Sequence, residues 1–221
     1  MNKITVLFDG YSEMLPNDPR GEVMKANCSC TLIQCKTGEN LIIDSMDCWS
    51  GPKLLEALKF HNLCPKDINF CISTHTHPDH LGNNNFFLNA RHIVAWSVSH
   101  RDEYFIHDFT EKPFKINENI KIIATKGHTL SCISVICENT NFDGKTVAIV
   151  GDLFEHENDI TDPELWKSAG SEAINDQLRN RHKMSMIADY IVPGHGPMFK
   201  VTQEIRKKLE DDMKNADLNI S

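Results

Sequence analysis

Membrane spans and targeting segments are the first features that this sequence lacks. No apolar run approaches the roughly 20 residues that a transmembrane helix needs, and the chain begins in strand-like sequence instead of a signal peptide. Linkers, heptad repeats and low-complexity tracts are also missing. We therefore expect a single domain over residues 1–221 that does not enter a membrane and that works in the cytosol, with the nucleus as a second compartment.

Ordered cysteine patterns are missing as well. The eight cysteines form no Cys-x-x-Cys pair and no even framework, which argues against a disulfide-stapled fold and indicates a reduced compartment. Cys28 and Cys30 are spaced like a soft-metal pair, but residues 27–33 alternate in the way of a strand with small side chains. We expect the cysteines to have structural roles.

Positive charge is scarce. The chain has 23 lysines and arginines against 31 aspartates and glutamates, for a net charge of −8. A surface of this sign repels nucleic acid as a whole. Two bound divalent cations would offset about four of these charges locally, so an electropositive active site is compatible with the acidic composition.

What the sequence does contain is a cluster of metal-ligand side chains within six residues, namely His75, His77, Asp79 and His80. The cluster follows the apolar run 68–72, which is typical of a short buried strand. On extended backbone the first two imidazoles point the same way, whereas the other two side chains lie past a turn. Crowded imidazoles repel one another when protonated, and a divalent cation converts the same crowding into binding energy. This loop could therefore contact two ions.

Strand and helix patterns alternate along the rest of the chain. Strand patterns cover residues 4–8, 31–35, 40–44, 68–72, 91–96, 120–125, 133–137, 146–150 and 189–192. Helical patterns cover residues 51–61, 84–88, 165–186 and 202–217. This alternation indicates an α/β fold.

Three more candidate ligands each follow a predicted strand. They are His128, Asp152 and His195. Asp152 can bridge two cations through its two oxygens, which a neutral imidazole cannot do. The glycines on either side of His195 would let its turn approach an ion closely.

The His-x-His-x-Asp-His motif, together with Gly127-His128-Thr129, Gly151-Asp152 and Pro193-Gly194-His195-Gly196, resembles the metallo-β-lactamase superfamily over about residues 23–204. The resemblance implies a four-layer αββα sandwich. It also implies that one ion is held by His75, His77 and His128, the other by Asp79, His80 and His195, with Asp152 shared. Asp79 and Asp152 are then the candidate catalytic residues, with Asp79 orienting or deprotonating the attacking water.

Imidazole and carboxylate ligands together suit zinc, while iron and manganese stay open on ligand type alone. Flavodiiron members of the superfamily usually carry a glutamate at the position of His77, so the resemblance favours hydrolysis over redox chemistry. Two metal ions activate water and stabilise charge on the attacking and leaving oxygens. No serine or cysteine nucleophile is needed.

The sequence segments 149–155 and 191–201 most resemble a subfamily of zinc ribonucleases assigned to histone pre-mRNA 3′-end processing. This resemblance implies an RNA substrate and a homodimer. The main alternative is a glyoxalase II-like hydrolase of a thioester or small ester, which the small size and acidity favour. A non-catalytic metal-binding interaction protein is a third alternative, which the complete ligand set weakens.

Four smaller expectations concern the surroundings of the site. Asp44 either orients a ligand imidazole, as an aspartate does in the superfamily, or is an ordinary turn residue. Residues 9–24 are expected to be a loop at the site mouth, and residues 97–119 either a lid or ordinary surface loop and edge strand. The basic cluster at 179–183 either contacts phosphates or is a solvated helix face.

Overall fold

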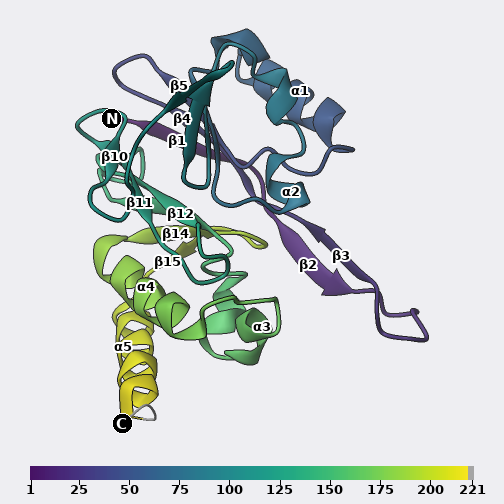
Figure 1. Ribbon diagram of the computed structural model, residues 1–221, viewed down its shortest axis with the longest axis vertical. Coiled ribbons are helices and arrows are strands. Elements are labelled where there is room, and N and C mark those ends of the chain that lie inside the picture. Colours follow the sequence, from purple (N-terminus) through teal and green to yellow (C-terminus); the bar gives the residue numbers. More distant parts are fainter. Residues whose placement is uncertain (219–221) are drawn as a thin grey trace.

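The structure, a computed structural model, describes residues 1–218 and contains two large β-sheets with helices on their outer faces (Figure 1). The first sheet has the order β1-β4-β5-β6-β7-β8-β9. Its strands are β1 (Lys3–Phe8), β4 (Cys30–Gln34), β5 (Asn40–Ile43), β6 (Phe70–Ser73), β7 (Arg91–Val94), β8 (Ser97–His100) and β9 (Glu103–Phe105).

The second sheet has the order β10-β11-β12-β13-β14-β15. Its strands are β10 (Phe114–Lys115), β11 (Ile120–Ala124), β12 (Ile133–Cys137), β13 (Val147–Gly151), β14 (Tyr190–Pro193) and β15 (Phe199–Lys200). A separate hairpin of β2 (Tyr11–Met14) and β3 (Met24–Asn27) extends away from both sheets (Figure 1).

Three clusters of buried apolar side chains separate four layers. The central cluster joins the inner faces of the two sheets, with Ile33 and Ile72 from the first sheet and Val135 and Ile149 from the second. The other two clusters lie under the helices on the outer faces. Burial of these apolar faces is the main favourable contribution to folding. The predicted α/β class and the αββα sandwich are confirmed.

The helices follow the amphipathic patterns of the sequence. α1 (Gly51–Phe60) begins with Pro52 in its first turn, where the missing N–H costs nothing, and it buries Leu54 and Leu58 against the first sheet. α4 (Ile174–Ile187) and α5 (Gln203–Leu218) cover the second sheet. The short helices are α2 (Pro78–Leu81), α3 (Glu164–Lys167) and the 3-10 turns η1 (Pro65–Asp67), η2 (Asn84–Phe86) and η3 (Glu157–Ile160).

Parallel strand pairs bring the candidate ligands to one edge of the sandwich. β5, β6 and β7 are parallel to one another, as are β13 and β14, so the loops after their carboxyl ends lie together at this edge. The N–H of Ile133 donates to the carbonyl of Thr74 across a distance of 2.9 Å. This bond ties the ligand loop of the first sheet to the second sheet.

Three segments differ from the sequence predictions. Residues 9–24 were expected to be a loop, and most of this segment is one, but Tyr11–Met14 form β2 and Met24 begins β3. β2 is exposed throughout, so it has no alternating apolar pattern. Residues 165–186 form two helices instead of one. The strand expected over residues 27–33 starts at Cys30, because Ser29 instead contacts the Gly194 turn.

The cysteines form no disulfide, and six of the eight are buried. Burial raises the pKa of Cys35 and of Cys132 to about 11, so both thiols stay protonated at neutral pH. Among the described residues no helix is both long enough and apolar enough to cross a membrane.

Candidate metal centre

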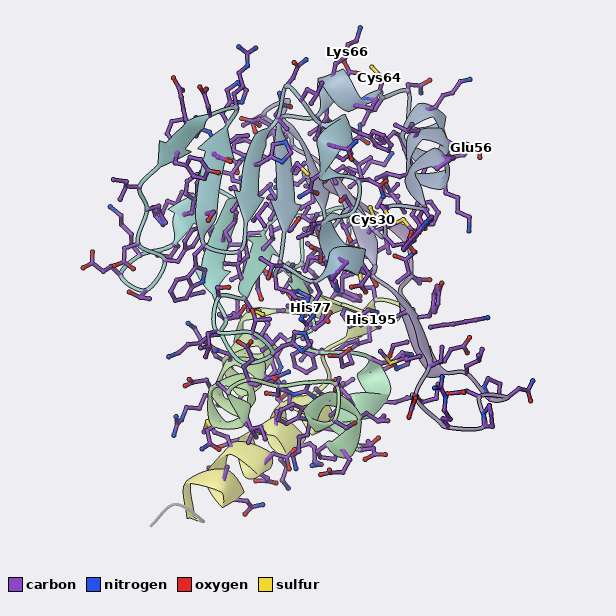
Figure 2. All side chains as sticks on the ribbon, turned by 45° about the vertical axis from the view of Figure 1, so that its right-hand side comes forward. Cys30, Glu56, Cys64, Lys66, His77 and His195 are labelled. Atoms are coloured by element: carbon purple, nitrogen blue, oxygen red, sulfur yellow. The ribbon has the colours of Figure 1, made fainter. Side chains whose placement is uncertain are left out.

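The seven predicted ligands come from four loops at one edge of the sandwich. The loop after β6 continues into α2 and supplies His75, His77, Asp79 and His80. The segments after β11, β13 and β14 supply His128, Asp152 and His195. Figure 2 shows His77 and His195 close together, between the sheet-rich part of the molecule and the helices of its lower part.

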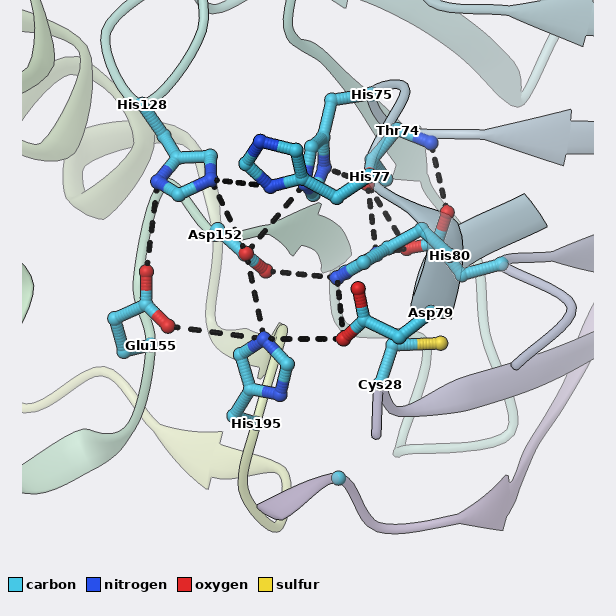
Figure 3. Close-up of polar contacts among 12 residues, drawn as sticks. Cys28, Thr74, His75, His77, Asp79, His80, His128, Asp152, Glu155 and His195 are labelled. Carbon is cyan, nitrogen blue, oxygen red and sulfur yellow. Dashed lines mark hydrogen bonds and ion pairs between the residues drawn. The ribbon is translucent and has the colours of Figure 1, made fainter. Parts of the chain in front are cut away.

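Asp152 lies at the centre of the group (Figure 3). The Nε2 atoms of four imidazoles surround its two carboxylate oxygens, at 3.5 Å for His75, 3.1 Å for His80, 3.4 Å for His128 and 3.3 Å for His195. The side chain of Asp152 is 4 % exposed. A buried carboxylate with imidazole nitrogens on both oxygens has the shape required of a bridging ligand.

The ligand atoms form two groups, each with its atoms within 4.8 Å of one another. The first comprises His75, His77, His128 and Asp152, and the second comprises Asp79, His80 and His195. This is the partition that the superfamily pattern implies. The structure therefore brings all seven predicted residues together, and their role as ligands stays a prediction.

Hydrogen bonds on the far side of two rings leave Nε2 facing the site. His80 donates from Nδ1 to Asp44 Oδ2 at 3.0 Å. His195 donates from Nδ1 to the carbonyl oxygens of Tyr11 and Asn27, each at 3.2 Å. A metal-binding histidine is commonly oriented by such a bond, which fixes the tautomer.

Asp44 therefore orients the ligand loop. Besides His80, it accepts hydrogen bonds from the Thr74 N–H at 2.7 Å and the Thr74 hydroxyl at 2.9 Å. Its backbone has a φ of +55°, in the left-handed region that aspartate tolerates better than most residues. These contacts favour the supporting role over the plain turn role.

Buried polar atoms without a hydrogen-bond partner gather around Asp152. Within the described residues they include His75 Nε2, His80 Nε2, His128 Nδ1, Asp152 Oδ1 and Glu155 Oε1. Such atoms are rare in folded proteins because each costs free energy when it is left unpaired. The donor set of imidazoles and carboxylates, with these unpaired atoms, fits divalent cations of the zinc type.

The pKa values of the rings diverge. Burial lowers the pKa of His75 well below its usual range. Burial acts in the same direction on His80 and His195, but the Asp152 carboxylate outweighs it and raises the pKa of both rings, in His80 together with Asp44. The pKa of Asp152 is well below its usual range: burial alone would raise it, and the surrounding imidazoles outweigh burial.

Glu155 belongs to the site, and the sequence analysis missed it. Its carboxylate lies 3.6 Å from His128 Nδ1 and 3.8 Å from His195 Nε2, and it forms a third possible ligand group with Asp152 and His195. Burial raises its pKa well above the usual range, and Asp152 and Asp159 add to the shift. The signal available in the sequence was that Glu155 is a carboxylate only three residues after the candidate ligand Asp152.

Two glycines allow the backbone to approach the site. A Cβ on Gly194 would lie 1.9 Å from Asp152 Oδ1, closer than any real contact. Gly151 has a φ of +55°, and a Cβ there would lie 2.3 Å from Thr74 Oγ1. The turns that carry Asp152 and His195 therefore require glycine.

The basic cluster at residues 179–183 is divided by burial. Arg181 is fully buried, donates from Nη1 to Asp159 Oδ2 at 3.0 Å and to the Leu153 carbonyl at 2.9 Å, and lies over the Phe154 ring. Asp159 Oδ2 in turn accepts from the N–H of Glu155 at 2.8 Å. Arg181 therefore neither contacts phosphate nor lies on a solvated helix face, so both sequence interpretations are wrong for this residue. It stabilises the segment Asp152–Glu155 from the interior of the protein.

The site opens to solvent over two of its ligands. His77 is exposed and the side chain of Asp79 is 21 % exposed, whereas His75 and His80 are fully buried. A substrate must therefore approach past His77 and Asp79.

Comparisons with known proteins agree with this geometry. The profile of the Metallo-beta-lactamase superfamily matches residues 24–119. Metallo-beta-lactamase domain-containing protein 1 of Xenopus laevis is 36 % identical over 203 residues, which cover 90 % of this chain and 82 % of that protein. The chain belongs to the metallo-β-lactamase superfamily. The human protein of the same name is 33 % identical over 229 residues, covering 91 % of this chain and 83 % of that one.

Solved structures of metallo-β-lactamases share the fold. A family protein from Thermus thermophilus superposes with a TM-score of 0.62 at 16 % identity, over 97 % of this chain and 79 % of that one. A metallo-β-lactamase from Pseudomonas aeruginosa in its mono-zinc form superposes with a TM-score of 0.61 at 15 % identity, over 94 % and 90 %. At these identities the likeness concerns the fold. Members of this superfamily are metal-dependent hydrolases.

Proposed function

We propose that this metallo-β-lactamase superfamily protein is a dinuclear zinc hydrolase, and specifically an endoribonuclease that cleaves phosphodiester bonds in RNA, as in histone pre-mRNA 3′-end processing. The observation that carries the metal part is the Asp152 carboxylate with four imidazole Nε2 atoms at 3.1–3.5 Å. Several of these buried atoms have no hydrogen-bond partner among the described residues. Two cations would satisfy these atoms and neutralise the carboxylates.

Each predicted ligand has a defined task in this proposal. His75, His77 and His128 would hold one ion and Asp79, His80 and His195 the other, with Asp152 between them. Zinc, when bound, supplies Lewis acidity and lowers the pKa of water. Asp79, whose carboxylate is partly exposed, accepts a hydrogen bond from the incoming water and orients it toward the substrate. Asp44 holds His80 in the tautomer that the ion needs.

The RNA part rests on the resemblance of residues 149–155 and 191–201 to a ribonuclease subfamily and on local charge. Two divalent cations at the site would make its surroundings electropositive although the chain carries a net charge of −8. Only 42 residues lie between Asp152 and His195, which leaves no room for an inserted domain such as large nucleases of the superfamily carry. The RNA would therefore bind in a small groove next to the ions.

The acidic composition favours a second candidate, hydrolysis of a thioester or small ester. A substrate of this kind needs no extended basic surface. The same metal site would serve it, because the chemistry of the ions is common to both reactions.

One experiment separates these candidates. Zinc content is measured first in the purified protein, and then RNA and S-lactoylglutathione are each offered with and without a chelator. Chelator-sensitive cleavage of RNA alone supports the ribonuclease, and turnover of the thioester alone supports the second candidate. A zinc-loaded protein that is inactive on both would indicate a metal-binding interaction protein. A protein that takes up no zinc would contradict the proposal.

The remaining parts of the proposal concern assembly and location. We propose a homodimer that works in the cytosol and in the nucleus. Size-exclusion chromatography with light scattering tests the dimer, because a mass near 25.1 kDa would indicate a monomer. Fractionation of cells tests the location.

A further inference from the structure

A cavity of about 400 Å³ lies on the same edge of the sandwich as the metal centre. Two of its lining residues connect it to the ligand loops. Trp96 follows Ala95, whose N–H donates to the Ser73 carbonyl at the end of β6, with a distance of 3.0 Å. Lys126 lies two residues before His128, so their Cα atoms are within about 7 Å of each other.

The walls of this cavity differ in chemistry. The apolar wall comprises Trp96, Phe109, Pro113, Ile123 and Ala124. The basic wall comprises Lys112, Lys126 and Lys183, and among the described residues of the lining Glu111 is the one acidic side chain. An excess of positive charge at one place on a chain of net charge −8 indicates that the cavity, hereafter the lysine cavity, attracts an anion.

Two of the three lysines of the lysine cavity have no anionic partner. The ammonium groups of Lys112 and Lys183 form no ion pair with any described residue, whereas Lys126 pairs with Asp176 at 3.3 Å. Lys112 and Lys183 are exposed, so an anionic ligand can reach both.

We infer that the lysine cavity binds a nucleotide next to the scissile bond, with its phosphate on the lysines and its base against the apolar wall. A purely aliphatic ligand would leave the lysines without an anionic partner. The inference rests on the proposed ribonuclease function and names where that function would hold its substrate.

Binding of uridine 5′-monophosphate to the zinc-loaded protein tests the inference, because this probe has no phosphodiester bond to cleave. We expect the double substitution Lys112→Glu with Lys183→Glu to raise Kd at least tenfold. The slope of log Kd against log salt concentration should flatten by about one for each lysine that contacts phosphate. The double substitution to arginine keeps the charge and should preserve binding.

Lys66→Glu is the matched control, because Lys66 is exposed at the far end of the molecule from His77 (Figure 2). It makes half the change in net charge of the double substitution, away from the cavity, and should leave Kd within about twofold. Zinc content and the melting temperature of each variant show that fold and metal site are intact.

Three results would overturn the inference: a Kd that the glutamate substitutions do not change, uridine binding as tightly as its monophosphate, or decanoate binding in preference to both. If the monophosphate depends on the lysines while RNA is not cleaved, the nucleotide site stands and the ribonuclease proposal fails. If RNA is cleaved with a KM that the lysine substitutions do not change, the lysine cavity is not the substrate site.

Discussion

At the scale of residues, the site depends on which nitrogen each imidazole turns toward Asp152. His80 and His195 each donate a hydrogen bond from Nδ1 to oxygen atoms of the protein, so that Nε2 faces the Asp152 carboxylate. The sequence could predict His80 from its close spacing to other candidate ligands, and His195 from its place after a predicted strand in a motif of the superfamily. It could not predict Glu155, whose approach to His128 depends on the path of a later loop.

Asp44→Asn should lower zinc affinity about 10- to 100-fold, the usual effect of removing a group that orients a metal ligand. The asparagine keeps the size of the side chain but replaces one acceptor oxygen with a donor. This donor faces either the Thr74 N–H or both His80 Nδ1 and the Thr74 hydroxyl. Competition with a chromogenic zinc chelator measures the change. Asp143→Asn, in an exposed turn, is the control, and equal affinities in the two variants would contradict the role of Asp44.

Zinc binding near pH 6.5 should release about two protons, one each from His80 and His195. Their pKa values are raised in the metal-free protein, so both rings hold a proton that the cation must displace. His75 contributes none, because its pKa is lowered. As pH falls through the raised pKa values, zinc affinity therefore falls, and as pH rises above them proton release declines.

Titration calorimetry in two buffers of different ionisation enthalpy measures this release. Heats that do not depend on the buffer would show that no proton is displaced.

At the scale of elements, helix α4 supports the metal centre through a buried ion pair. Arg181 contacts Asp159 and the Leu153 carbonyl, and Asp159 holds the N–H of Glu155. The sequence predicted a helix here and grouped Arg181 with its basic neighbours. Burial of one arginine among them follows from packing against Phe154 and Trp166, which the local pattern of charges does not reveal.

Arg181→Ala should destabilise the protein by about 3–5 kcal/mol, because it leaves Asp159 buried without its partner. Lys183→Ala on the same helix is the control, since Lys183 is exposed, and its loss should cost about 0.5 kcal/mol or less. Urea unfolding followed by circular dichroism measures both. Similar midpoints for the two variants would contradict this account of the buried pair.

At the scale of the whole molecule, the metal centre joins the two sheets. Its ligands come from β6 and α2 on one side and from the segments after β11, β13 and β14 on the other. Cations held between the halves would therefore stabilise the sandwich as a unit. The same edge carries the lysine cavity, so binding and chemistry are placed together.

Removal of zinc with a chelator should lower the melting temperature by about 5–10 °C. A ligand present at a hundred times its Kd contributes about 2.7 kcal/mol, and each kcal/mol shifts the melting temperature of a domain of this size by about 2–4 °C. Differential scanning fluorimetry measures the shift, and added zinc should restore the original value. An unchanged melting temperature in a protein shown to have lost its zinc would contradict a role in stability.

The sequence by itself determined the α/β class and most central strands, because alternating apolar residues are a local signal. It also determined the seven candidate ligands, four from their close spacing and three, His128, Asp152 and His195, from strand ends and the motifs that resemble the superfamily. Only the tertiary structure decided that four Nε2 atoms meet at Asp152, that Glu155 joins them, that Arg181 is buried, and that residues 11–14 form an exposed hairpin strand. These features depend on contacts between segments far apart in the chain, and local sequence does not specify which distant segments come into contact.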